Sequence, residues 1–530
     1  MVTKYLVGVD FGTTGSRTVI YDLQGNEIGN GYAENVITFP ESGAYEYNGD
    51  RAIRALWDTT ARAIKTSGID PHNIASVCFS AIRGCFGLYD EDDNFVYPLT
   101  LWPDTRGTPK IAWMKDRLET VGFSHEELYN KSGFPFFAGF PSSRMLWFRD
   151  SHPKIWSRVK KIGSLQTVVQ KAYGGYSNVD DAEDVGWFQQ FDMRTCEPIA
   201  KMEQAWGLDP GLYADFVPAG TPVGKVSKEA ASQTGLIEGT PLICGVGDQQ
   251  CTIIGTNCLK SGIISIYSGT CGVIVARTHD LILDPSRRLN VCGAPGGEWE
   301  LEGTTTGMGG NYRWLRDTLG QDELNEAGTR GISVYDVLNE RAEASPPGSR
   351  GVMFLPYLSG ADTPKLDRYA RGAFLGMNQQ HRKGDFVRAV IEGSTFELKT
   401  VMDVFRNTGI SIENFRFSGG GANSKLWSQV VADVFNVPVT TVATPEATAL
   451  GAAIIGGVGA GLFSNVWEAA ENMVKQTGTW DPIEENVRIY ADQFELQQEC
   501  YRVMSGNGLF QQFAEREASL QPSPNASGKG

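Results

Sequence analysis

The chain has 530 residues, of which 41% are hydrophobic and 21% charged, and its 47 basic and 62 acidic residues leave a net charge of −15. This balance excludes a wholly disordered or collagen-like protein. Its acidity disfavours binding to nucleic acid or to an anionic membrane surface. At roughly 100–200 residues per domain, the length predicts two to four domains.

Residues 1–15 lack the basic region, apolar core and cleavage site of a signal peptide. Residues 449–463 are weakly polar but too short to cross a bilayer, and they predict a buried helix packed through small residues. The nine cysteines include no Cys-x-x-Cys pair, and the five histidines show no metal-ligand spacing. We therefore expect a cytoplasmic protein with reduced thiols, no zinc site and no membrane partner.

The first predicted element is a hairpin: a strand over residues 5–9, a glycine-threonine loop over 10–17 and a return strand over 18–21. Because the loop joins two strands and opens no helix, it is neither a Rossmann turn nor a Walker loop. Asp10 ends the apolar strand, where a carboxylate needs a metal or a donor. The loop therefore predicts a site for phosphate and Mg²⁺, the alternatives being a plain hairpin turn and, for Arg17, a surface charge.

Residues 242–250 begin as an apolar strand and turn polar at Asp248, which follows a glycine. At such a position an aspartate is either a turn or helix cap, or a general base that accepts a proton from an attacking hydroxyl.

The hairpin pattern recurs as a strand over residues 263–267, a loop over 268–272 and a return strand over 273–276. This repeat suggests a duplicated architecture, with two lobes of related fold and a boundary near residues 255–262.

Helical spacing of apolar residues covers residues 386–405. A strand at 415–417 then meets a glycine turn at 418–424 and a helix at 425–435, capped by Asn423 or Ser424. A strand, a glycine turn and a helix N-terminus suit an anion or the edge of a nucleotide. A closing helical segment is expected over about 482–506.

These motifs resemble the FGGY family of carbohydrate kinases, within the actin-like ATPase superfamily, over about residues 5–463. Residues 372–377 and 385–392 fit the family's second signature position by position. Residues 139–148 nearly meet the first, with Arg144 where lysine is usual. Two departures are Ala361-Asp362, in place of Glu-Arg, and Gly84, where some relatives carry glutamate.

The resemblance implies an α/β protein with two ribonuclease-H-like (actin-like ATPase) lobes that close on a cleft. Residues 1–257 would form the N-terminal lobe with the sugar site, the first phosphate loop and the catalytic aspartate. Residues 258–518 would form the ATP-binding lobe, and residues 519–530, rich in Ser, Pro and Gly, a disordered tail. Since relatives are often dimers, a homodimer is kept open.

The resemblance also implies roles for individual residues. Asp10 would serve Mg²⁺, and Asp248 would be the catalytic base. ATP would be bound at the phosphates by Gly12, Thr13, Thr14, Arg17, Gly269 and Thr270, and at the adenosine by Gly420, Gly421 and Asn423.

The residues predicted for the acceptor pocket resemble those of different members of the family. Arg83 matches an arginine of glycerol and autoinducer-2 kinases, whereas Trp102 and Asp104 look like a xylulokinase motif. Gln249, beside the base, would also contact the acceptor. The alternatives are a core tryptophan for Trp102 and a loop ion pair for Asp104.

The expected activity is transfer of the ATP γ-phosphate to a primary hydroxyl of a small ketose or polyol, as in xylulokinases or autoinducer-2 kinases. One alternative is a kinase for glycerol or another polyol. Two others come from different classes: an actin-like ATPase switch that ignores sugar, and a sugar-sensing regulator without catalysis.

Overall fold

The computed structural model describes residues 3–136 and 139–520, which pack as two compact units. Unit 1 contains the chain up to Ser261, Val275–Leu301 and Glu446–Lys475. Unit 2 contains Gly262–Ile274, Glu302–Pro445 and the chain from Gln476 onward. The packing units are therefore not two continuous stretches, and the functional division into residues 1–257 and 258–518 stays a prediction.

Unit 1 is built on a six-stranded mixed sheet. Its strands, in sheet order, are β11 (Pro222–Lys225), β12 (Pro241–Gly247), β5 (Ile74–Ala81), β1 (Tyr5–Phe11), β2 (Gly15–Asp22) and β3 (Glu27–Glu34). β12, β5 and β1 are parallel to one another, and the other pairs are antiparallel. The first predicted hairpin is thus confirmed, but its turn is only residues 12–14, because Asp10 and Arg17 pair across β1 and β2.

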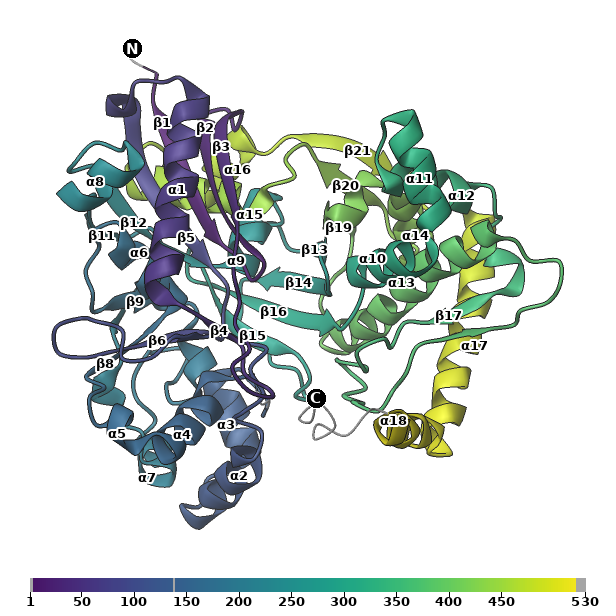
Figure 1. Cartoon of the computed structure of the whole chain (residues 1–530), viewed down its shortest axis with the longest axis horizontal. Helices are drawn as coiled ribbons and strands as arrows, with labels where there is room; N and C mark the ends of the chain where they lie inside the picture. Colours follow the sequence, from purple (N-terminus) through teal and green to yellow (C-terminus); the bar gives the residue numbers. More distant parts are fainter. Residues whose placement is uncertain (1–2, 137–138, 521–530) are drawn as a thin grey trace, which may run out of the picture. The chain divides into compact units, whose positions relative to one another are not determined.

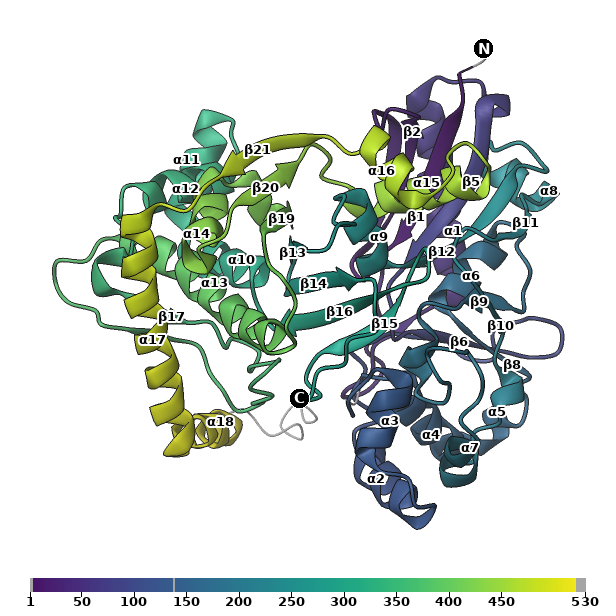
Figure 2. The ribbon, with the colours of Figure 1, turned by 180° about the vertical axis from the view of Figure 1, so that it is seen from behind.

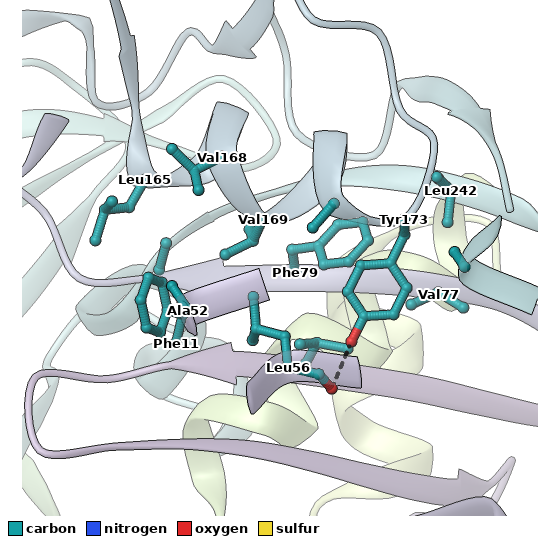
Figure 3. Close-up of a cluster of buried hydrophobic side chains, with 14 of the residues drawn as sticks. Phe11, Ala52, Leu56, Val77, Phe79, Leu165, Val168, Val169, Tyr173 and Leu242 are labelled. Carbon is teal, nitrogen blue, oxygen red and sulfur yellow. Dashed lines mark hydrogen bonds between the residues drawn. The ribbon is translucent and has the colours of Figure 1, made fainter. Parts of the chain in front are cut away.

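One face of this sheet carries a large apolar core. Alternate residues of β1 and β5, such as Val7, Val9 and Phe79, pack against helices α1 (Gly49–Ser67) and α6 (Leu165–Ala172). Figure 3 shows this cluster, in which the hydroxyl of the buried Tyr173 donates to the backbone oxygen of Leu56 at 3.0 Å.

The opposite face is covered by helix α15 (Ala447–Gly459), which approaches the strands through small residues. A Cβ on Gly8 of β1 would lie 1.9 Å from the backbone oxygen of Ala449. Figure 1 shows α1 in front of this sheet, and Figure 2, from behind, shows α15 and α16 (Val466–Met473) in front of it. The predicted buried helix near residue 449 is confirmed, and within the described residues no helix is both long and apolar enough to cross a membrane.

Unit 1 also contains a four-stranded sheet, a two-stranded sheet and further helices. The strands are β4 (Glu46–Tyr47), β7 (Leu99–Thr100), β6 (Phe86–Tyr89), β8 (Lys161–Ser164), β9 (Val179–Asp181) and β10 (Asp215–Val217). The helices are α2 (Lys110–Thr120), α3 (His125–Ser132), α4 (Pro141–Ser151), α5 (Pro153–Trp156), α7 (Ala200–Trp206), α8 (Lys228–Thr234) and α9 (Asp248–Gly255).

The remaining strands lie in a seven-stranded sheet and a small antiparallel pair. The order of the larger sheet is β15 (Asn290–Ala294), β16 (Glu298–Thr305), β14 (Gly272–Thr278), β13 (Ile263–Ser268), β19 (Asn414–Gly419), β20 (Val439–Val442) and β21 (Gln476–Trp480). The pair is β17 (Met353–Leu355) with β18 (Ala373–Leu375). The second predicted hairpin is confirmed as β13 and β14, with a shorter turn over residues 269–271.

Three helices of unit 2 lie where the sequence predicts helices: α13 (Lys383–Asn407), α14 (Lys425–Phe435) and α17 (Glu484–Gly506). The helices α10 (Gly309–Leu319), α11 (Gln321–Arg330), α12 (Val334–Glu343) and α18 (Leu509–Leu520) were not predicted. α14 begins and ends where the sequence predicts, because the Ser424 hydroxyl caps it by accepting the Trp427 N–H. Ser519 and Leu520, predicted to begin a disordered tail, close α18 instead, and the rest of that prediction lies outside the described residues.

Candidate functional site

Three predicted site residues lie at one edge of the unit 1 sheet. Asp10 is the penultimate residue of β1, Arg83 follows β5, and Asp248 comes directly after β12. Since β12, β5 and β1 are parallel neighbours, their carboxyl ends share this edge, which is where α/β sheets place ligands. We call these residues the carboxyl-edge site.

Asp10 is a partly buried residue whose carboxylate has one oxygen without a hydrogen-bond partner among the described residues. It lies opposite Arg17 on β2 and Ser80 on β5, and its Oδ1 atom is buried without a hydrogen-bond partner among the described residues. Burial, and then the nearby Asp248 carboxylate, raise the pKa of Asp10 to about 7. A carboxylate oxygen without a partner can bind a cation or accept a hydrogen bond from a ligand.

Asp248 opens helix α9 and has a well-defined set of partners. The Nε atom of Arg83 donates to its Oδ1 at 3.3 Å, and the backbone N–H of Gln249 donates to the same oxygen at 3.0 Å. The Gln249 side chain reaches Oδ2 at 3.3 Å. The Asp248 side chain nevertheless keeps 27% of its surface exposed, so a ligand can reach it.

The turn between β1 and β2 is held by a hydrogen bond of its own and by others from Asn35 and Trp102. The Gly12 N–H donates to the Gly15 oxygen at 3.0 Å, and the Asn35 amide donates to the Gly12 oxygen at 2.7 Å. The Trp102 indole N–H donates to the Thr13 hydroxyl at 3.2 Å, while Thr14 is exposed. The structure thus brings Trp102, from a different part of the chain, beside the predicted phosphate turn.

Two predicted ligand residues have other partners in the structure. Arg17 forms an ion pair with Glu446 and stacks over the Tyr32 ring at 4.8 Å. Asp104 is fully buried, and its oxygens accept hydrogen bonds from Arg106 and from the Tyr45 N–H. Asp104 therefore shows the loop ion pair that was the alternative to an acceptor contact.

A further carboxylate, which the sequence did not single out, holds the segment around Asp248. Asp184 is 8% exposed and accepts the Gly247 N–H at 3.1 Å and the Gln250 side-chain amide at 2.7 Å. Gly247 directly precedes Asp248, and Gln250 follows it by two residues. In the sequence, the run Asp180-Asp-Ala-Glu-Asp184 is typical of a solvated acidic loop. Its burial comes from tertiary packing, which the local sequence does not indicate.

In unit 2, the predicted second phosphate turn lies on the start of α10. The Gly309 and Gly310 N–H groups donate to the carbonyl oxygens of Gly269 and Thr270 at 2.9 and 3.0 Å. A Cβ on Gly309 would lie 2.5 Å from the Gly269 oxygen, so this approach requires glycine. Arg313, which sequence analysis missed, donates to the Thr270 hydroxyl at 3.1 Å and places a positive charge beside the turn.

The predicted adenosine residues lie next to this turn. β13 and β19 are parallel and pair Ser268 with Gly419, so their carboxyl ends coincide. A Cβ on Gly421 would lie 2.6 Å from the Ser268 hydroxyl oxygen, which is buried without a partner among the described residues. Gly420 and Asn423 are exposed on the short helix that follows β19. Unit 2 therefore gathers its predicted nucleotide residues at one sheet edge.

Among the described residues, no group of three or more His, Cys, Asp or Glu side chains is placed to hold a metal ion. A cation at Asp10 would therefore take most of its ligands from water and from a bound ligand. Mg²⁺ typically binds this way, through one or two carboxylates plus substrate phosphates. The unpartnered Asp10 oxygen fits that mode.

The buried Glu183, next to Asp184, gives a testable pH dependence of stability. Burial raises its pKa to about 7, although the Ala219 N–H, 3.1 Å from both oxygens, opposes this shift. The folded pKa lies above the unfolded value, so its contribution to stability is present at low pH and lost as the pH rises through about 7. We expect Glu183→Gln to be more stable than the unmodified protein at pH 8 by about 1–3 kcal/mol.

Chemical denaturation of both proteins between pH 5 and pH 8 measures this difference. The glutamine keeps an acceptor for the Ala219 N–H, so the two stabilities should converge at the acidic end. Parallel loss of stability in both proteins across the range would contradict the assignment to Glu183.

Comparison with known sequences gives a consistent picture. Residues 5–255 match the N-terminal domain, and residues 265–460 the C-terminal domain, of the FGGY family of carbohydrate kinases. An autoinducer-2 kinase of Enterobacter sp. (strain 638) is 30% identical over 510 residues, covering 94% of each chain.

Other relatives carry different names. A gluconokinase of Bacillus subtilis (strain 168) is 27% identical and covers 92% of this chain and 94% of its own. A xylulose kinase of the same organism is 25% identical and covers 94% of this chain and 97% of its own. Among solved structures, the ligand-bound xylulose kinase from Lactobacillus acidophilus has a TM-score of 0.84 at 23% identity, covering 95% of this chain and 98% of its own, which shows the same fold.

Proposed function

Because the chain belongs to the FGGY family of carbohydrate kinases, and is thus a phosphotransferase with an alcohol acceptor, we propose that it transfers the γ-phosphate of ATP to a primary hydroxyl of a small ketose or polyol. The observation that carries this proposal is the carboxyl-edge site, where a partly exposed Asp248 lies near the unpartnered Asp10 oxygen. Relatives named xylulose kinase and autoinducer-2 kinase support the acceptor class.

Asp248 is the proposed general base. Phosphoryl transfer needs little covalent chemistry from the protein, so the main tasks are to orient the acceptor hydroxyl and to accept its proton. Arg83, held against the Asp248 carboxylate at 3.3 Å, keeps the base in one orientation and is a further proposed contact of an acceptor hydroxyl. Gln249 and Trp102, whose polar groups lie beside Asp248 and Thr13, are the further proposed acceptor contacts.

Asp10 is the proposed protein ligand for Mg²⁺. Bound there with nucleotide phosphates, Mg²⁺ would neutralise charge on the transferring group. A bound cation also offsets the cost of keeping Asp10 ionised next to Asp248. The proposed nucleotide contacts at the phosphates are Gly12, Thr13, Thr14, Arg17, Gly269 and Thr270, and at the adenosine Gly420, Gly421 and Asn423.

Arg313 provides a test of the proposed nucleotide role of the Thr270 turn. We expect Arg313→Ala to raise the KM for ATP about five- to tenfold, because an exposed arginine that orients a phosphate contact contributes about 1 kcal/mol. Arg316→Ala, on the same helix, is the matched control, since Arg316 pairs with Asp317 and Tyr335 instead. Steady-state kinetics with varied ATP measures both variants, and equal KM values for them would contradict the assignment.

The proposed function is tested by measuring ADP release with and without acceptors. A coupled assay with ATP and Mg²⁺ would compare xylulose, ribulose, glycerol, erythritol and the autoinducer-2 precursor dihydroxypentanedione. A kinase releases ADP in proportion to acceptor phosphate, with one or two acceptors strongly preferred. ADP release that is the same with every acceptor and without any would indicate the sugar-independent ATPase switch instead.

A further inference from the structure

A small cavity in unit 1 lies against the segment that holds the proposed base. Arg83 and Gly247, the neighbours of Asp248, form part of its wall. Its volume is about 20 Å³, whereas a cavity needs roughly 10–15 Å³ to hold one water molecule. The cavity therefore accommodates a group the size of one oxygen atom and not a whole sugar.

Two buried polar atoms belong to residues that line this cavity and have no partner among the described residues. Gln166 is 2% exposed, and its Oε1 atom accepts no hydrogen bond. The indole N–H of Trp187 is buried and donates none. A buried acceptor and a buried donor without partners are costly, and a hydroxyl group offers both the donor and the acceptor that these two atoms lack.

The wall of the cavity is acidic. Among its described lining residues, Asp180, Asp181 and Asp184 are carboxylates and Arg83 is the one cation. The Arg83 charge already faces the Asp248 carboxylate at 3.3 Å and the Trp187 ring at 5.1 Å. Burial, followed by the neighbouring Asp184, Asp180 and Glu183, holds the pKa of Asp181 well above its usual range. The same burial and the same neighbouring carboxylates would strongly disfavour the negative charge of a ligand's carboxylate in this cavity.

Gly84, which follows Arg83 in the wall of the cavity, contributes no side chain to it. Gly84 has a φ of +68°, and a Cβ there would lie 3.1 Å from the Trp187 ring. A larger residue would displace the ring or fill the space beside it.

We propose that this cavity is a subsite that receives one uncharged hydroxyl group of the acceptor and rejects a carboxylate. The acceptor is then a neutral ketose or polyol and not a sugar acid. This inference rests on the proposed function, since it concerns the acceptor of the same reaction. It separates this chain from the relative named gluconokinase, whose identity of 27% lies between those of the xylulose kinase at 25% and the autoinducer-2 kinase at 30%.

Matched acceptor pairs that differ only at one end test the subsite: xylitol with xylonate, glucitol with gluconate, and glycerol with glycerate, together with xylulose. We expect kcat/KM for the preferred neutral compound to exceed that for its acid by at least about 100-fold. Acids used as well as the neutral members would overturn the subsite while leaving the kinase intact. Phosphorylation of none of these compounds, nor of the other acceptors above, would overturn the proposed function itself.

A substitution in the cavity gives the second arm of the test. We expect Gln166→Leu to raise the KM for the preferred neutral acceptor about tenfold and to leave the KM for ATP unchanged, because it removes the orphaned acceptor atom. Gln170→Leu is the control on the same helix: Gln170 is also buried and its Oε1 is also unpartnered, but it does not line the cavity. Equal effects of the two substitutions, or none from Gln166→Leu, would overturn the proposal.

Discussion

Replacing Asp248 with asparagine is expected to lower kcat for acceptor phosphorylation by about 10²–10⁴-fold, the usual contribution of a positioned general base. The amide keeps acceptor capacity for the Gln249 N–H and nearly the same shape, but it takes no proton from the acceptor hydroxyl. ATP affinity should be nearly unchanged, because the proposed nucleotide contacts lie elsewhere. Steady-state kinetics and calorimetric titration with ATP measure the two effects separately.

Asp248→Glu is the graded control for this prediction. It keeps the carboxylate but moves it by one methylene from its position against Arg83, so we expect a loss smaller than that of the asparagine variant. Near-normal turnover of Asp248→Asn would show that another group, or no group, accepts the proton.

Gly255→Ala and Gly451→Ala are expected to lower the stability of unit 1 by about 3 kcal/mol or more each, at the upper end for overpacked sites. The two glycines lie where α9 and α15 cross. A Cβ on Gly255 would lie 1.8 Å from the Ala447 oxygen, and a Cβ on Gly451 would lie 1.8 Å from the Cys251 oxygen. Since these contacts are with backbone, the helices must move apart. Because α9 begins at Asp248, activity should fall as well.

Gly328→Ala is the matched control for the crossing. This glycine lies in α11, and a Cβ there would meet nothing within 4 Å. Alanine has the higher helix propensity, so this substitution should stabilise the protein by up to about 1 kcal/mol. Thermal unfolding midpoints distinguish the two cases, and unchanged midpoints for Gly255→Ala and Gly451→Ala would contradict the tight crossing.

Local sequence patterns predicted the elements that place the site. Both hairpins, the strand that ends before Asp248 and helix α14 with its Ser424 cap lie where glycine, apolar alternation and capping residues indicated them. The boundaries of the turns were less accurate. Asp10 and Arg17 read as loop residues because they are polar, yet backbone pairing extends the strands past them.

Contacts made by distant segments could not be predicted in this way. The ion pair of Arg17 with Glu446 depends on how α15 returns to the unit 1 sheet. The burial of Asp184, Glu183 and Asp181 depends on several packed elements, and their sequence alone is typical of a solvated loop. Asp104 matched an acceptor motif, but its pairing with Arg106 follows from burial of the whole loop.

The central claim is that this chain moves phosphate from ATP to an alcohol at Asp248, and phosphorus NMR of the reaction products tests it most directly. With ATP, Mg²⁺ and the preferred neutral acceptor, we predict one new phosphomonoester for each ADP formed, and its loss in Asp248→Asn. ADP accompanied only by inorganic phosphate, or undiminished phosphomonoester from the variant, would contradict the account.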